Sequence, residues 1–124
     1  MVIVKEVMKQ LVTYNGLVGY QLETERKKLG IEQSELALKT GISQPALSRL
    51  EQGKSLITID QLFVICRELE VAPENVISLA NKGVVEIQKE ESIDIKTTKE
   101  ASNTMDVVLA GAAIGAVLTL LFSK

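Results

Sequence analysis

Residues 33–54 read QSELALKTGISQPALSRLEQGK, and this stretch decides the fold because it holds two short helical patterns on either side of a turn. The first pattern predicts a helix from about residue 33 to residue 40. Its inward-facing residues are expected to be Leu36, Ala37 and Leu38. Gly41 ends this helix, because a glycine just past a helix end takes the left-handed conformation without a steric penalty. Ile42 is then expected to be the apolar residue that packs into the turn.

A second helix follows the turn, and Ser43 is well suited to be its N-cap. Pro45 is tolerated at the second helical position, since the amide hydrogen that it lacks has no partner in a first turn. The apolar stripe is Ala46, Leu47 and Leu50, and the residues on or near the outward face are Gln44, Pro45, Ser48 and Arg49. Gly53 ends the helix, and Lys54 follows it as a free cation. We interpret the stretch as a helix-turn-helix with a short polar face able to enter a major groove.

At these residues the chain resembles the phage-repressor or Cro-type helix-turn-helix family, often called XRE-like. The resemblance covers about residues 19–80, through the runs RKKLGIEQSELA and GISQPALSRLEQGK and the amphipathic helix that follows them. The match is specific, since the order of the runs, their spacing and the turn chemistry all agree. It implies an all-α, five-helix repressor-like domain that binds double-stranded DNA through the second helix of the motif, the recognition helix.

The resemblance also implies roles for single residues. Base-edge contacts are expected from Gln44, Arg49 and Ser48, and phosphate contacts from Gln33 and Lys54. The full predicted set of DNA-binding residues is Gln33, Ser43, Gln44, Ser48, Arg49 and Lys54.

An ion pair that is common in the family is expected here between Arg26 and Glu51. We expect this pair to be structural and partly buried, joining the first helix of the domain to the end of the recognition helix. The chain departs from the family pattern at two positions. Glu32 stands where a serine N-cap is usual, and Pro45 occupies a position that reads a base in some members but offers only apolar contact here.

The composition excludes several kinds of site. The chain has 124 residues, 46% of them hydrophobic, with no histidine and one cysteine, so we expect neither a disulfide nor a zinc site of the usual ligand type. Cys66 lies on an apolar helix face and is predicted to be a buried core residue rather than a reactive thiol. Without histidine, a glycine-rich phosphate loop or a clustered acid pair, the sequence predicts no enzyme and no cofactor.

The charge pattern supports DNA binding less than the motif does. Residues 1–83 contain ten Lys or Arg and ten Asp or Glu, so no global basic field drives binding, and any basic patch must be local. The candidate residues for such a patch are Arg26, Lys27, Lys28, Lys39, Arg49 and Lys54. The alternative interpretation is that these charged residues only lie on solvent-exposed helix faces.

Before the helix-turn-helix domain, which is predicted to span residues 17–83, the chain carries an N-terminal amphipathic segment, residues 1–16. Its apolar residues recur at three- and four-residue spacing, and Asn15 and Gly16 are expected to end it. Charged residues interrupt this apolar run, so we see no cleavable signal peptide and expect the folded part of the chain to be intracellular.

The domain itself is predicted to start with a helix at about residues 17–29, which Gly30 closes. The buried residues of this helix are expected to be Val18, Leu22 and Leu29. Thr58 and Gln61 form a capping box for the main core helix, which follows the helix-turn-helix. Its apolar residues are Ile59, Leu62, Phe63, Ile65, Cys66 and Leu69.

A last short helix, residues 74–80, is predicted after Pro73, and the domain is expected to close at Lys82 and Gly83. The helix returns Val76, Ile77 and Leu79 to the core. Residues 84–104 then contain three lysines and five acidic residues, which favours an exposed acidic linker. A short β-hairpin remains the alternative, because apolar and polar residues alternate within this stretch.

The C-terminal segment, residues 105–124, contains the run VVLAGAAIGAVLTLLF at residues 107–122. A helix that is apolar on all sides cannot lie on a protein surface, and sixteen residues span about 24 Å against a hydrocarbon core of about 30 Å. We favour a transmembrane helix that tethers the domain to the inner face of the cell membrane; the alternative is an oligomerisation helix buried in a soluble assembly. Gly111 and Gly115 form a GxxxG pattern that permits close helix pairing in either setting, which predicts a homodimer or higher oligomer.

Two functions from different classes follow from these observations. The favoured function is a sequence-specific DNA-binding transcriptional regulator, tethered to the membrane by its C-terminal tail. The alternative is a protein-interaction module of the RodZ kind, in which a similar domain binds a protein partner at the membrane. The base-reading residue types on the recognition face favour the first, and the neutral charge of the domain favours the second.

Overall fold

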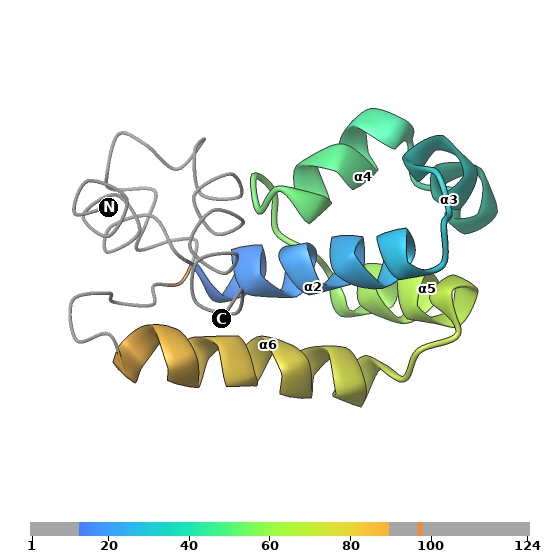
Figure 1. Cartoon of the computed structure of the whole chain (residues 1–124). Coiled ribbons are helices and arrows are strands. Elements are labelled where there is room, and N and C mark those ends of the chain that lie inside the picture. The colour runs from blue at the N-terminus through green and yellow to red at the C-terminus, as the bar shows by residue number, and fades with distance from the viewer. Residues whose placement is uncertain (1–12, 90–96, 98–124) are drawn as a thin grey trace.

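Five helices make up the part of the chain that the structure, a computed structural model, describes, namely residues 13–89 and residue 97 (Figure 1). The helices are α2 (Tyr14–Lys28), α3 (Gln33–Thr40), α4 (Gln44–Glu51), α5 (Ile59–Leu69) and α6 (Pro73–Lys89). This part of the chain is all-α, as predicted. Most of the predicted N-terminal segment and the whole of the apolar run 107–122 lie outside the described residues.

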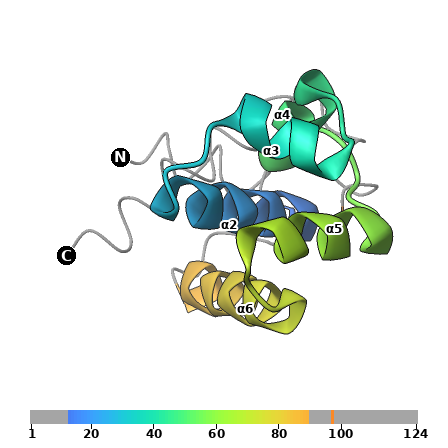
Figure 2. The ribbon, with the colours of Figure 1, turned by 90° about the vertical axis from the view of Figure 1, so that its right-hand side faces the viewer.

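Helix α2 runs through the middle of the fold, with α4 on one side of it and α6 on the other (Figure 1). Figure 2 shows the same layers from the side, with α5 closing the space between the helix-turn-helix and α6. Side chains from all five helices meet in one apolar core. Its buried residues are Leu22, Leu36, Ala37, Leu47, Leu50, Leu62, Ile65, Cys66, Leu69 and Val76.

The predicted turn and caps are confirmed. Gly41 has a left-handed φ of 75° and ends α3, and the Ser43 hydroxyl caps α4 by accepting a hydrogen bond from the amide of Ala46 at 3.2 Å. Thr58 and Gln61 form the reciprocal capping box at the start of α5. These features are local in sequence, which is why residue types alone could predict them.

The start of α2 differs from the prediction. Asn15 and Gly16 do not end a preceding helix but lie in the first turn of α2. Thr13 provides the reason, because its hydroxyl accepts a hydrogen bond from the amide of Gly16 at 2.9 Å and so caps the helix earlier than expected. At the other end, Leu29 is the exposed C-cap of α2 instead of a core residue.

Some apolar residues that were expected to face the core are exposed. Leu38 is 86% exposed, since each helical residue turns by about 100° and three consecutive positions cannot share one inward face. Ile59 and Phe63 lie one turn apart on the exposed side of α5, and Ile77 is exposed on α6. Val18 is half-buried at the edge of the core.

Helix α6 runs from Pro73 to Lys89, so the prediction of a short helix over residues 74–80 is wrong. Val76, Ala80 and Gly83 are buried and recur at helical spacing, and α6 packs along α2. We attribute the longer helix to the burial of this face in the packing of α6 against α2. Residues 84–89 are therefore helical and form neither linker nor hairpin.

None of the described helices is both long enough and apolar enough to cross a bilayer.

Glycines allow an unusually close contact between α2 and the end of α4. A Cβ atom on Gly19 would collide with the backbone carbonyl oxygen of Leu50. Gly53, which has a left-handed φ of 74°, lies against Gly16, whose Cα atom would be 2.7 Å from a Cβ added at Gly53. The backbones of the two elements therefore touch without side chains between them.

We predict that Gly19→Ala lowers the free energy of unfolding by about 3 kcal/mol, because the neighbouring atoms are backbone and cannot swing away. Gly30→Ala is the matched control. Nothing lies within 4 Å of a Cβ added at Gly30, so only its left-handed φ of 69° is penalised, by about 1–2 kcal/mol. Denaturant unfolding of both variants tests this order, and equal losses would contradict the close contact.

The single cysteine is predicted to be inert in the folded protein. Burial raises the pKa of the Cys66 thiol to about 11, so almost no thiolate is present at pH 8. The unfolded chain has an ordinary thiol pKa of about 8.5, and its reaction with a disulfide reagent should be on the order of a hundred-fold faster. Thiol titration with and without denaturant measures this ratio; similar rates in both states would place Cys66 at the surface.

Candidate nucleic-acid interface

Helix α4 presents a short polar surface on the outside of the fold. The side chains of Gln44, Pro45 and Arg49 are exposed, as is the Ser43 cap, while Ser48 is half-buried. On the opposite side of the helix, Leu47 and Leu50 are buried in the core. The structure thus brings the predicted base-reading residues together on one exposed face, and Lys54 follows, also exposed, three residues after the helix ends.

A buried ion pair fixes the end of α4 to α2. The Arg26 Nε atom donates to Glu51 Oε2 at 2.8 Å, and Nη2 donates to Oε1 at 3.0 Å. The side chains are only 9% and 1% exposed. The hydrogen bonds with Glu51 raise the pKa of Arg26 above its ordinary value, although burial opposes this. The predicted structural pair is present, and it is more deeply buried than expected.

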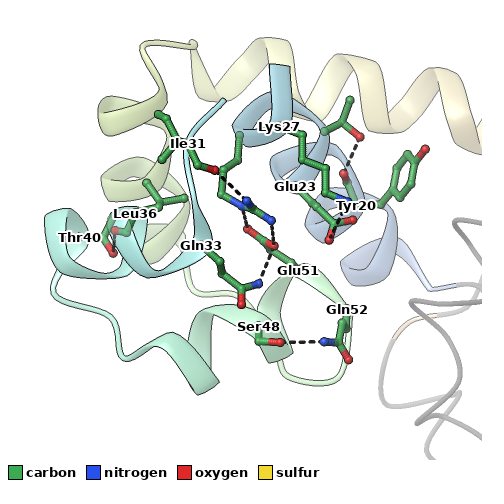
Figure 3. Close-up of polar contacts among 12 residues, drawn as sticks. Tyr20, Glu23, Lys27, Ile31, Gln33, Leu36, Thr40, Ser48, Glu51 and Gln52 are labelled. Carbon is green, nitrogen blue, oxygen red and sulfur yellow. Dashed lines mark hydrogen bonds and ion pairs between the residues drawn. The ribbon is translucent and has the colours of Figure 1, made fainter. Parts of the chain in front are cut away.

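Two further groups complete this network, which Figure 3 shows in close-up. Arg26 Nη1 donates to the backbone carbonyl of Ile31 at 2.8 Å, which ties the α2–α3 loop to the guanidinium. Gln33 Nε2 donates to Glu51 Oε1 at 2.9 Å. The start of α3 and the end of α4 are therefore joined through one carboxylate. This protein partner of Gln33 was not foreseen; the phosphate contact of Gln33 stays a prediction.

Ser48 also has a partner inside the protein. The Gln52 Nε2 atom donates to the Ser48 hydroxyl oxygen at 2.7 Å, one turn along α4 (Figure 3). The hydroxyl accepts this bond and keeps its own hydrogen to donate to a ligand. Ser48 can thus still donate to an acceptor group on DNA.

Asn15 is a residue that the sequence analysis misjudged. Its Nδ2 atom donates to the Ser55 carbonyl at 2.6 Å, and its Oδ1 atom accepts from the amide of Ile57 at 2.9 Å. The side-chain amide therefore joins the first turn of α2 to the loop between α4 and α5. The partners lie 40 and 42 positions away in sequence, so no local pattern could have indicated them.

The positive charge available at this surface is concentrated in two residues. Three of the candidate cations lie beside acids of their own helices, at 3.7, 3.7 and 3.3 Å: Lys27 with Glu23, Lys28 with Glu25, and Lys39 with Glu35. Arg26 is buried in its pair with Glu51. Within the described ranges no ion pair involves Arg49 or Lys54, and both are exposed. These two cations, one on α4 and one just after it, remain free for a negatively charged ligand.

Comparisons with known proteins agree with this geometry. A family model described as "Helix-turn-helix" matches residues 22–76. An uncharacterized helix-turn-helix-type transcriptional regulator from Haemophilus influenzae is 41% identical over 54 residues, which is 44% of this chain. The chain spans about half, 53%, of the length of that relative. The prediction that the chain is not an enzyme agrees with this class of domain.

Two similar solved structures are of the clp gene regulator ClgR from Corynebacterium glutamicum. One has a TM-score of 0.61 at 24% identity, covering 63% of this chain and 83% of that one. The other has a TM-score of 0.55 at 26% identity, covering 56% of this chain and 90% of that one. The first likeness is one of fold alone.

We predict that Glu51→Ala lowers the free energy of unfolding by about 3–5 kcal/mol, because it leaves Arg26 buried without its carboxylate partner. Glu35→Ala is the control. It removes an exposed ion pair with Lys39, which should cost no more than about 1 kcal/mol. Denaturant unfolding measured on both variants gives the comparison. A loss for Glu51→Ala no larger than that for Glu35→Ala would mean that the buried network does not hold α4.

Proposed function

Because residues 22–76 form a helix-turn-helix domain of the phage-repressor or Cro type, we propose that the chain is a sequence-specific DNA-binding transcriptional regulator. The observation that carries this proposal is the division of α4 into two sides. Its buried side is fixed by the core and by Glu51, while its outer side exposes Gln44 and Arg49. Side chains held on a rigid helix can be presented to base edges at defined positions.

The proposed base contacts follow from the chemistry of these side chains. Arginine makes paired hydrogen bonds to guanine, and glutamine makes them to adenine, so Arg49 and Gln44 are suited to two different purines. Ser48 accepts from Gln52 and keeps its hydroxyl hydrogen to donate to a base or a phosphate. Ser43 lies at the helix start, next to Gln44, and completes the set on this face.

Phosphate contacts are proposed for Lys54, which follows the end of α4, and for Gln33, at the start of α3. Lys54 is exposed and unpaired within the described part of the chain, so its charge is available to the DNA backbone. Gln33 shares one amide hydrogen with Glu51 and has a second to donate. Because most lysines of the domain have acidic neighbours, we expect few phosphate contacts and a shallow dependence of affinity on salt.

Membrane tethering and self-association are the sequence-based part of the proposal. The apolar run 107–122 would hold the domain at the cytoplasmic face of a membrane, and the GxxxG pattern of Gly111 and Gly115 would pair two copies. Pairing raises the local concentration of the two domains, so that two weak half-site contacts act together on one operator.

A protein-interaction module of the RodZ kind remains the second candidate, and one observation favours it. Leu56, Ile59 and Phe63 are exposed at and just after the loop that follows α4, where a protein partner could cover them. The equal numbers of basic and acidic residues in positions 1–83 also give little general attraction to DNA.

A binding selection from random duplex DNA distinguishes these functions. With residues 1–104, we expect enrichment of a site that is two-fold symmetric, and Arg49→Ala should cost about 1–3 kcal/mol at one preferred base pair. Lys54→Ala is the comparison. It should weaken binding to all sequences nearly equally, because a phosphate contact positions the protein without discriminating between bases. No enrichment at low salt, together with no effect of Arg49→Ala, would exclude the regulator and leave the interaction module.

A further inference from the structure

The loop between α4 and α5 carries Lys54, and its position depends on contacts with α2. At its start, Gly53 takes a left-handed φ of 74° and lies against Gly16. The amide of Lys54 donates to the Arg49 carbonyl at 2.9 Å, which holds the backbone of Lys54 against the end of α4. Beyond this point the backbone of the loop leaves α4 and has no helix of its own until α5 begins at Ile59.

Asn15 makes the hydrogen bonds that hold the loop on the C-terminal side of Lys54. Its side-chain amide donates to Ser55 and accepts from Ile57, so it holds the backbone directly after the lysine at two points. Within the part of the chain that the structure describes, the amides of Ser55 and Leu56 make no hydrogen bond, and Leu56 is 67% exposed. Asn15 is thus the principal polar contact that orders this stretch of loop.

We infer that Asn15 is a positioning residue for DNA binding: by holding Ser55 and Ile57, it sets the place from which Lys54 reaches a phosphate. This inference rests on the proposed function and extends it to the first turn of α2, which carries none of the predicted DNA-binding residues. A loop that is ordered before binding does not lose its conformational entropy on binding, so its lysine contributes more to affinity. Without the bridge, Lys54 would remain charged but would be held on one side only.

The test compares full-length wild-type protein, in detergent if needed, with Asn15→Ala, Lys54→Ala and the double variant. Binding to the duplex enriched by selection is measured by fluorescence anisotropy between about 50 and 200 mM salt. Lys54→Ala should make the slope of log affinity against log salt shallower by about one. We expect Asn15→Ala also to make this salt slope shallower and to weaken binding to preferred and random duplexes by the same factor. In the double variant, Asn15→Ala should add little to the loss of affinity that Lys54→Ala causes alone.

Two controls separate positioning from stability. Asn81→Ala removes an exposed asparagine on α6, on the other side of α2, and should leave both affinity and slope unchanged. Hydrogen exchange of the Ile57 amide should quicken in Asn15→Ala while the amides of α5 stay protected, which shows that the variant is folded. Asn15→Asp keeps the acceptor for the Ile57 amide but places a carboxylate oxygen against the Ser55 carbonyl in place of the donor. Its loss should likewise shrink when Lys54 is absent.

The outcomes are distinct. If wild-type protein binds no duplex, the proposed function fails and this inference falls with it. If wild-type protein binds DNA but Asn15→Ala leaves the salt slope unchanged, or if the losses from Asn15→Ala and Lys54→Ala simply add, the inference is overturned and the proposed function stands. A shallower slope with losses that do not add supports the positioning role, since a general loss of stability would not act through one lysine.

Discussion

The buried carboxylate of Glu51 is the constraint on which the rest of the structure depends. A charge removed from water is costly unless it is paired and hydrogen-bonded, and Glu51 meets this need with the guanidinium of Arg26 and the amide of Gln33. The same guanidinium also donates to the carbonyl of Ile31. Three segments that lie apart in the chain, α2, the start of α3 and the end of α4, are therefore held at one point.

This ion pair can form only because the backbones of α2 and α4 approach very closely. Gly19 leaves room for the carbonyl of Leu50, and Gly16 leaves room for Gly53 just after the helix. With larger residues at these positions, α4 would be pushed outward, and the carboxylate would no longer reach Arg26. The glycines and the ion pair therefore act together: the former set the distance between the helices, and the latter sets their relative orientation.

The sequence predicted those features that depend on neighbouring residues. The left-handed Gly41, the Ser43 cap and the Thr58 capping box follow from preferences within a few positions, and the structure contains all three. The buried pair was expected only through the family resemblance, because nothing local links Arg26 to a residue 25 positions away. The bridge made by Asn15 had neither kind of support and was missed.

The predicted boundaries of α2 and α6 were wrong for a related reason. A glycine read alone indicates a helix end, but Gly16 and Gly83 are buried within helices, Gly16 against the loop after α4 and Gly83 on the face that packs along α2. In both cases tertiary contact overrode local preference. Exposed apolar residues such as Leu38 were misjudged because composition does not say which side of a short helix is covered.

The fixed contact between α2 and α4 has a consequence for how such a domain can change over time. The buried contacts that hold α4 lie on its inner side, in Leu47, Leu50 and Glu51, while Gln44 and Arg49 on its outer side are exposed. Substitutions at Gln44 or Arg49 can therefore accumulate without unfolding the domain or tilting the helix. After gene duplication, two copies could diverge in ligand preference while inheriting the same scaffold, so new specificities need not pass through unstable intermediates.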